Sequence, residues 1–347
     1  MDRLSVYMTD RCNLACGYCW VAVNRGAARG PSAAALRRAV DDLLDRRGSK
    51  IVFLGGEPLL RYPALLKTAE YARSRSARLV MEVLTNGTLL DSGRLEALFG
   101  LGVNVTVSLD GPPEVNDAGR GRSVAAKVLR RLEGWESRLG VNSVFCPATA
   151  CRLEASVDFL RRRGFGRISL SPDMNAAWSD ESLEGLRTSL AGLRRAYRRT
   201  LMGSARPFQI PTLFSVLEHR APGRRRCRNL ALGPDGSYYA CDRAMGFPAG
   251  AARGLRVGKP GRFDRAAREA ILARAEAAIG SLGWSAEPVF CPMGPFFHAG
   301  LGREAADPRL EGFRRLSETV SSALHGIVDD NRDLPAYKAL YEDVRLV

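Results

Sequence analysis

The stretch that decides the fold runs from residue 4 to residue 20 and reads LSVYMTDRCNLACGYCW. Its apolar beginning, residues 4–8, predicts a β-strand, and Cys12, Cys16 and Cys19 follow on one compact loop. Three such thiolates can hold three irons of a cubane cluster and leave the fourth iron open. A zinc site usually takes paired C-x-x-C spacings, and the sequence has no second one. We therefore predict a [4Fe–4S] cluster, with zinc and redox-active thiols as the alternatives.

The C-x-x-x-C-x-x-C spacing, with an aromatic residue after the third cysteine, resembles the signature of radical S-adenosylmethionine (SAM) enzymes. The resemblance implies that SAM binds the open iron through its amino and carboxylate groups. Reductive cleavage then gives a 5′-deoxyadenosyl radical that abstracts a substrate hydrogen, while the protein supplies binding and orientation. The resemblance also implies that Trp20 lies near the adenine of SAM. The alternative is an ordinary aromatic residue of the core.

Length and composition agree with such an enzyme. The chain has 347 residues, 46% of them hydrophobic, which suffices for two domains or for one large barrel with an extension. No signal peptide is expected at its start, and its apolar stretches are too short to span a membrane. Eight cysteines without a signal peptide indicate a reducing compartment, so we expect a cytoplasmic protein without membrane association.

The net charge of +15 comes almost entirely from arginine, since only five of the 52 basic residues are lysines. Most of the arginine pairs lie on predicted helices, which favours solvated helix faces. The other interpretation is a surface that attracts an acidic partner, such as an acidic leader peptide, a phosphate or a nucleic acid. Nucleic acid is not the expected partner, because no basic motif is interleaved with aromatic residues.

Strand-like and helix-like segments alternate as far as residue 201, which is typical of parallel βα units. The strand candidates are residues 4–8, 51–54, 79–84, 103–109, 141–145 and 168–170. The helix candidates are residues 32–46, 61–75, 91–99, 123–138, 153–163 and 180–201. The expected fold class is therefore α/β. Six repeats resemble the open, TIM-like (β/α)6 partial barrel of radical SAM enzymes, where ligands bind at the C-terminal ends of the strands.

Gly55-Gly56-Glu57-Pro58 follows the second strand candidate. Two glycines let the backbone approach a ligand closely, and a carboxylate can bind an ammonium group. Here the segment resembles the family motif that binds the amino group of SAM, which implies cofactor contacts for Gly55, Gly56 and Glu57. A tight turn capped by Glu57 is the alternative. Asn86, after the third strand candidate, is interpreted as a turn former rather than a ligand contact.

Ser108-Leu109-Asp110-Gly111 ends the fourth strand candidate, and Arg120 lies downstream. This stretch resembles one in the branch of the family that modifies peptides and proteins, although Asn116 stands where that branch commonly has histidine. The resemblance implies that Ser108 and Asp110 contact ribose hydroxyls or substrate, and that Arg120 binds the SAM carboxylate. The alternative is an Asp-Gly turn with an unrelated arginine.

Cys146 ends the fifth strand candidate, and Cys151 lies five residues further on. A thiol at the mouth of a barrel could return a hydrogen atom to a substrate radical or ligate a second cluster. Cys146 is therefore a candidate catalytic residue. Inert thiols are the alternative for both, because cysteine is among the most buried residue types.

A segment rich in Gly, Ser and Pro at residues 202–211 predicts a domain boundary. We expect a radical SAM partial barrel over residues 1–205 and a smaller domain over residues 206–347. In the smaller domain, Pro234-Asp235-Gly236 predicts a β-hairpin that would bring Cys227 and Cys241 together.

These two cysteines, with Cys291 later in the chain, resemble the SPASM or twitch extension and its auxiliary [4Fe–4S] cluster. A full SPASM domain has about seven cysteines by family analogy, whereas three follow residue 200 here. The fourth ligand is left open between His298, a barrel cysteine, water and substrate. The remainder is expected to form helices over residues 264–281, 309–325 and 335–345.

The expected function is a radical SAM enzyme that cross-links, epimerises or oxidises a peptide in natural-product biosynthesis. An electron donor such as a flavodoxin or ferredoxin is expected as a partner. The enzymatic alternative is a dehydrogenase or epimerase of a sugar, an aminocyclitol or another small metabolite. A non-enzymatic iron–sulfur or zinc protein that binds nucleic acid through its arginines is a third hypothesis.

Overall fold

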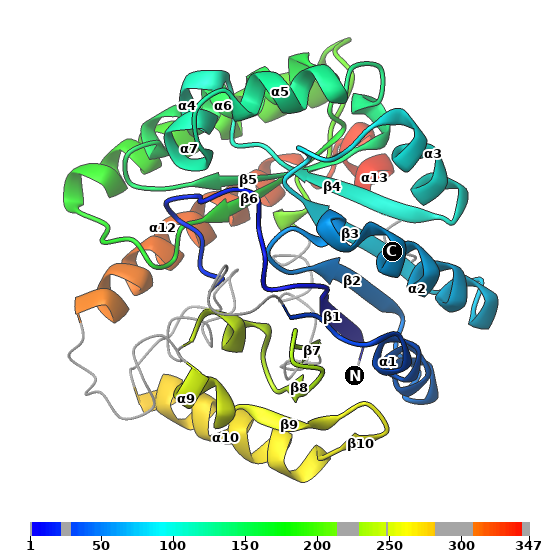
Figure 1. Cartoon of the computed structure of the whole chain (residues 1–347). Helices are drawn as coiled ribbons and strands as arrows, with labels where there is room; N and C mark the ends of the chain where they lie inside the picture. The colour runs from blue at the N-terminus through cyan, green and yellow to red at the C-terminus, as the bar shows by residue number, and fades with distance from the viewer. Residues whose placement is uncertain (1, 22–28, 214–228, 248, 282–307, 342–347) are drawn as a thin grey trace. The chain divides into compact units, whose positions relative to one another are not determined.

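The computed structural model describes residues 2–21, 29–213, 229–247, 249–281 and 308–341. Residues that pack together fall into two compact units. Unit 1 comprises residues 1–107, 127–132 and 225–277, and unit 2 comprises residues 108–126, 133–224 and 278–347. Figure 1 shows the helices and strands of both.

Parallel strands form the centre of unit 1. They are β1 (Arg3–Tyr7), β2 (Lys50–Leu54), β3 (Val80–Thr85) and β4 (Val103–Ser108). Their register pairs Leu4 with Ile51, and Phe53 with Val83. All four of these side chains are fully buried. The strands form because β-branched and aromatic residues pack well on a pleated surface.

Three helices connect these strands and lie along one face of them (Figure 1). They are α1 (Ala33–Asp45), α2 (Tyr62–Arg75) and α3 (Ser92–Gly100). Ser32 begins α1 by accepting a hydrogen bond from the Ala35 amide, and Asp91 begins α3 by accepting one from the Arg94 amide. Such a cap gives a partner to an amide that has none within the helix.

The chain later adds further strands to the sheet of unit 1. β7 (Asn229–Leu232) pairs in parallel with β1, and β8 (Tyr238–Tyr239) pairs antiparallel with β7, which confirms the predicted hairpin. β9 (Arg256–Lys259) and β10 (Arg262–Phe263) were not expected from the sequence. They extend the order to β10-β9-β8-β7-β1-β2-β3-β4. The helices of this part are α9 (Ala249–Arg253) and α10 (Arg265–Ser281).

Unit 2 is built on β5 (Gly140–Phe145) and β6 (Arg167–Pro172), which pair in parallel along their whole length. Its helices are α4 (Pro113–Arg120), α6 (Leu153–Arg162), α7 (Asp180–Met202), α12 (Pro308–Asn331) and α13 (Pro335–Tyr341). The Arg194 guanidinium on α7 donates to Asp330 on α12 over 2.6 Å. The Tyr197 and Tyr341 hydroxyls are 3.0 Å apart, so α7 also contacts α13.

Strands and helices alternate as expected, and the α/β class is confirmed. Each strand and helix candidate overlaps an observed element, but the helix expected over residues 123–138 is divided. It becomes α5 (Val124–Arg131) and a 3-10 turn at Glu136–Arg138. Gly134 lies between them with φ of 82°, a conformation that glycine adopts without strain. Helix α4 was not expected from the sequence; it begins with Pro113, a residue that is favoured at the first position of a helix.

The expected domain boundary at residues 205 and 206 stays a prediction. Packing groups residues 225–277 with the first 107 residues, because β7 pairs with β1. Within the described part of the chain, no helix is long and apolar enough to cross a membrane.

Candidate functional site

The loop that follows β1 carries Cys12, Cys16 and Cys19. Cys12 and Cys16 are partly exposed, Cys19 is exposed, and none forms a disulfide with a described residue. The Cys19 amide donates to the Cys16 carbonyl over 3.1 Å, and the Leu14 amide lies 3.4 Å from the Cys12 sulfur. Burial raises the pKa of the Cys12 thiol.

Three thiols on one accessible loop match an iron–sulfur cluster in the chemical type of their donor atoms. Among the described residues, no group of three His, Cys, Asp or Glu side chains lies close enough together to hold a metal ion. The fit therefore rests on the donor set and its accessibility.

Gly55 and Gly56 lie against the backbone of this cysteine loop. The Gly56 amide donates to the Thr9 carbonyl over 2.9 Å, and the Glu57 amide donates to the Arg11 carbonyl over 2.7 Å. A Cβ on Gly56 would lie 2.1 Å from the Arg11 oxygen, and Gly55 has φ of 142°. These glycines are thus required for close contact between two parts of the chain, in addition to any role toward a ligand.

Gly56→Ala is expected to displace the cysteine loop, because the added methyl group overlaps the Arg11 carbonyl. We expect a loss of about 1–3 kcal/mol in the free energy of unfolding, and fewer irons per chain after reconstitution. Gly100→Ala, at the end of α3, is the matched control, because outside its own helix turn the new Cβ meets no atom within 4 Å. Urea unfolding and iron analysis measure both variants, and equal values for the two would contradict this role.

Glu57 is fully buried and its carboxylate is bonded to the chain. It accepts hydrogen bonds from the Leu59 amide (3.0 Å), the Thr85 hydroxyl (2.7 Å) and the Asn86 amide (2.8 Å). Burial raises the pKa of Glu57, and these hydrogen bonds act in the opposite direction. Glu57 therefore ties the ends of β2 and β3 together, and its contact with SAM stays a prediction.

Asn86 does more than form a turn. Its Oδ1 accepts from the Thr88 amide over 2.9 Å, which is the expected turn contact. Its Nδ2 donates to Asn13 over 2.9 Å and lies 3.8 Å from the Cys12 sulfur. Asn13 in turn donates to the Thr88 hydroxyl over 2.8 Å. Neither Asn13 nor Thr88 was predicted from the sequence. The position of Asn13 next to Cys12 is a signal that could have found it.

Trp20 follows Cys19 and contacts two side chains of unit 1. Its ring meets Tyr7 edge-on, with ring centroids 6.4 Å apart, and the Arg243 guanidinium lies 4.5 Å from its ring centroid. The Tyr7 hydroxyl donates to the Asp242 carbonyl over 3.2 Å. Neither Tyr7 nor Arg243 was expected at the site, because Tyr7 was interpreted only as a strand residue and Arg243 lies far from Trp20 in the sequence.

The expected auxiliary ligands are only partly described. Cys241 is buried beside the Asp242 carboxylate, with its sulfur 3.7 Å from Asp242 Oδ1. Cys227, Cys291 and His298 lie outside the described residues.

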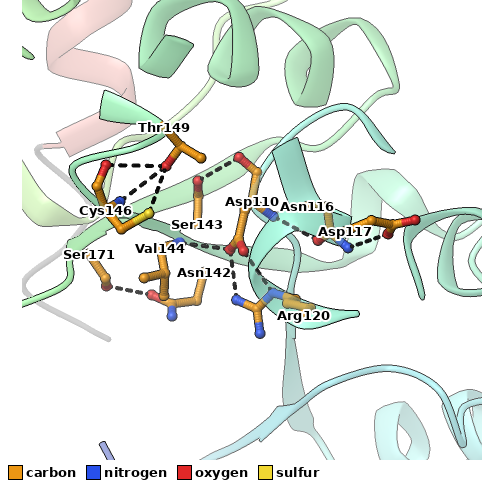
Figure 2. Close-up of polar contacts among 10 residues, drawn as sticks. All are labelled: Asp110, Asn116, Asp117, Arg120, Asn142, Ser143, Val144, Cys146, Thr149 and Ser171. Carbon is orange, nitrogen blue, oxygen red and sulfur yellow. Dashed lines mark hydrogen bonds and ion pairs between the residues drawn. The ribbon is translucent and has the colours of Figure 1, made fainter. Parts of the chain in front are cut away.

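In unit 2, Asp110 and Arg120 form a buried two-point ion pair (Figure 2). The Arg120 Nε and Nη2 donate to the two carboxylate oxygens of Asp110 over 3.0 and 2.7 Å. The Arg120 side chain is 6% exposed and the Asp110 side chain 2%, so water screens the attraction between their charges little. The guanidinium expected to bind the SAM carboxylate thus already binds a carboxylate of the chain, and its contact with SAM stays a prediction.

The same Asp110 holds the end of β5. The Val144 amide donates to Asp110 Oδ1 over 2.9 Å, and the Ser143 hydroxyl donates to the Asp110 carbonyl over 3.2 Å. Asn116, which replaces the expected histidine, accepts from the Asp110 amide over 3.1 Å. Ser108, the last residue of β4, is partly exposed. Figure 2 shows this network on one side of Cys146.

Cys146 directly follows β5 and is partly buried. Its amide donates to the Thr149 hydroxyl over 3.1 Å, and its sulfur lies 3.5 Å from the same oxygen (Figure 2). Cys151 is exposed in the 3-10 turn at Ala150–Arg152. The structure thus places Cys146 at the C-terminal end of a parallel strand, where reactive groups gather in α/β barrels.

Comparisons with known proteins agree with these observations. Residues 6–160 match the model of the radical SAM superfamily. The chain is similar to Fe-coproporphyrin III synthase of Methanosarcina barkeri, with 39% identity over 116 residues, 33% of this chain and 28% of that protein. It is also similar to PqqA peptide cyclase of Gluconobacter oxydans, with 28% identity over 204 residues, 55% of this chain and 54% of that protein. The matches thus span about half or less of these two relatives.

A solved structure shares the fold. It is native anSMEcpe with bound AdoMet and Cp18Cys peptide, with a TM-score of 0.69 and 16% sequence identity. The likeness covers 95% of this chain and 99% of that one. Radical SAM enzymes bind a [4Fe–4S] cluster and SAM, and the cysteine loop, the Gly-Gly-Glu segment and Asp110 all lie within residues 6–160. Residues 6–160 are therefore identified as a radical SAM domain by their match to the model of that superfamily.

Proposed function

We propose that this protein is an enzyme that cleaves SAM reductively and modifies a peptide. The observation that carries the proposal is the cysteine loop, held by the backbone of Gly56 and Glu57 and by the side chain of Asn86. When bound, a [4Fe–4S] cluster with SAM supplies a 5′-deoxyadenosyl radical that abstracts a hydrogen atom from the substrate. In this proposal Cys12, Cys16 and Cys19 hold the cluster, and a flavodoxin or ferredoxin supplies the electron.

The residues of the chain supply binding and orientation in this proposal. The proposed SAM contacts are those implied by the family resemblance: Trp20, Gly55, Gly56, Glu57, Ser108, Asp110 and Arg120. Arg120 has a second role, because its ion pair with Asp110 fixes the carboxylate that also binds the Val144 amide. An auxiliary cluster of the SPASM or twitch type, held by Cys227, Cys241 and Cys291, completes the proposed cofactor set.

A peptide is the proposed substrate for two reasons. PqqA peptide cyclase and the peptide-bound anSMEcpe structure are both similar to this chain. The net charge of +15 also favours an acidic leader segment on the substrate. The similarity to Fe-coproporphyrin III synthase favours the other candidate, a small-molecule substrate, and the test must separate the two.

Anaerobically reconstituted protein, reduced with dithionite and given SAM alone, is expected to release 5′-deoxyadenosine slowly. Precursor peptides with acidic leaders should increase this rate and change mass, whereas small metabolites should not. Mass spectrometry of the nucleoside and of each candidate substrate measures both. Absence of 5′-deoxyadenosine would overturn the proposal that the protein is an enzyme. Stimulation by small metabolites alone would overturn the proposal of a peptide substrate.

Cys146 is proposed to return a hydrogen atom to the substrate radical. The thiol S–H bond breaks and a substrate C–H bond forms, leaving a thiyl radical that the electron donor must reduce with uptake of a proton. Cys146→Ala is then expected to keep SAM cleavage but to lose or divert an epimerised product. Cys151→Ala, with an exposed thiol on the next turn, is the control. Unchanged product and turnover in Cys146→Ala would show that this thiol only packs.

A further inference from the structure

The segment that follows Cys241 contacts both ends of the cysteine loop. At the beginning of the loop, Tyr7 donates its hydroxyl proton to the Asp242 carbonyl over 3.2 Å. At its end, Trp20 lies under the Arg243 guanidinium, 4.5 Å from the ring centroid. Tyr7 and Trp20 also contact each other edge-on. All of these residues belong to unit 1, so the contacts lie within one compact body.

Burial and charge support a close association of these groups. Tyr7 is fully buried. Desolvation raises the pKa of Tyr7 well above its usual value, the Asp242 carboxylate and the Cys241 thiol act in the same direction, and Arg243 opposes them. The Cys241 thiol and the Arg243 guanidinium therefore both lie close enough to the Tyr7 phenol to influence its charge.

A guanidinium over an indole face is a favourable cation–π contact, and indole is the best of the aromatic partners. Because Trp20 is bonded directly to Cys19, this contact fixes the end of the cysteine loop. It also keeps a permanent positive charge near the third cysteine, since arginine does not lose its proton in proteins. A nearby cation stabilises the more negative, reduced state of an iron–sulfur cluster.

We propose that Arg243 is a positioning residue that links the Cys241 segment to the cysteine loop. Through Trp20 it holds the loop, and through its charge it raises the reduction potential of a cluster bound by Cys12, Cys16 and Cys19. The charge effect rests on the proposed function, whereas the contact with Trp20 does not. Movement of the Cys241 segment would thus change how readily the first cluster is reduced.

The first test uses the protein without its clusters. Arg243→Gln is expected to increase acrylamide quenching of tryptophan fluorescence, because it uncovers the Trp20 ring. The same change in a Trp20→Phe background should have no effect, although three other tryptophans remain. An equal increase in both backgrounds, or none in either, would overturn the contact.

The second test uses reconstituted protein and redox titration followed by EPR. Arg243→Gln should lower the midpoint potential of the SAM-binding cluster, and Arg243→Lys should restore most of it. Arg253→Gln removes the same charge from an exposed position on α9 and should leave the potential unchanged. Equal potentials in wild type and Arg243→Gln would overturn the charge effect. If the wild-type protein bound no cluster that cleaves SAM, the proposed function would be overturned instead. The quenching result, and with it the contact between Arg243 and Trp20, would still stand.

Discussion

Replacing Cys12, Cys16 and Cys19 together with alanine is expected to abolish SAM cleavage. Without these thiols no iron remains to bind the methionine end of SAM, so 5′-deoxyadenosine should fall below detection rather than merely decrease. In the proposed two-cluster protein, iron should fall from about eight to about four per chain, because each cubane holds four irons. Anaerobic reconstitution, iron analysis and mass spectrometry of the nucleoside measure both effects.

Cys151→Ala is the matched control for this experiment. Its thiol is exposed and lies in unit 2, outside the cysteine loop. This variant should retain both iron content and SAM cleavage. Undiminished 5′-deoxyadenosine from the triple variant would contradict the central assignment, and four irons in the wild type would contradict the auxiliary cluster.

Asp110→Asn is expected to cause the largest loss of stability among single substitutions in the site. It leaves the 6%-exposed Arg120 guanidinium without its charged partner and places an amide where two acceptor oxygens are needed. Breaking a buried ion pair in this way costs about 3–5 kcal/mol. The Asn side chain keeps one, neutral acceptor oxygen, for which the Val144 amide and the Arg120 guanidinium then compete, so the end of β5 before Cys146 should loosen as well. Urea unfolding measures the first effect, and hydrogen exchange at Val144 the second.

Two further variants show whether the buried charge is responsible. Glu184→Gln removes the same charge from an exposed pair with Arg187 and should change stability by about 1 kcal/mol or less. Asp110→Asn combined with Arg120→Gln removes both charges and should recover part of the loss, because no unpaired charge stays buried. If Asp110→Asn lowered the free energy of unfolding as little as Glu184→Gln, the buried ion pair would contribute little to stability.

Most of the helix and strand pattern was encoded locally and could be predicted from the sequence, with β9, β10 and α4 as exceptions. Strand β2 is a short apolar run, and the helices α1 and α3 begin at Ser32 and Asp91, whose side chains bond amides three residues ahead. The hairpin of β7 and β8 followed from Pro234-Asp235-Gly236, where Gly236 adopts φ of 75°. These signals act over a few residues, so they do not depend on the rest of the fold.

The partners of the functional side chains were decided only by the tertiary structure. The spacing of Cys12, Cys16 and Cys19 predicted an iron–sulfur site, because thiols so close in sequence lie on one loop. The sequence could not indicate that Gly56 packs on that loop, that Arg120 pairs with Asp110, or that Arg243 covers Trp20. Each of these contacts depends on strands and loops brought together by the sheet, as when β7 joins β1 across more than two hundred residues. The residue type determines which groups a side chain can bind, and the fold determines which of these groups it meets.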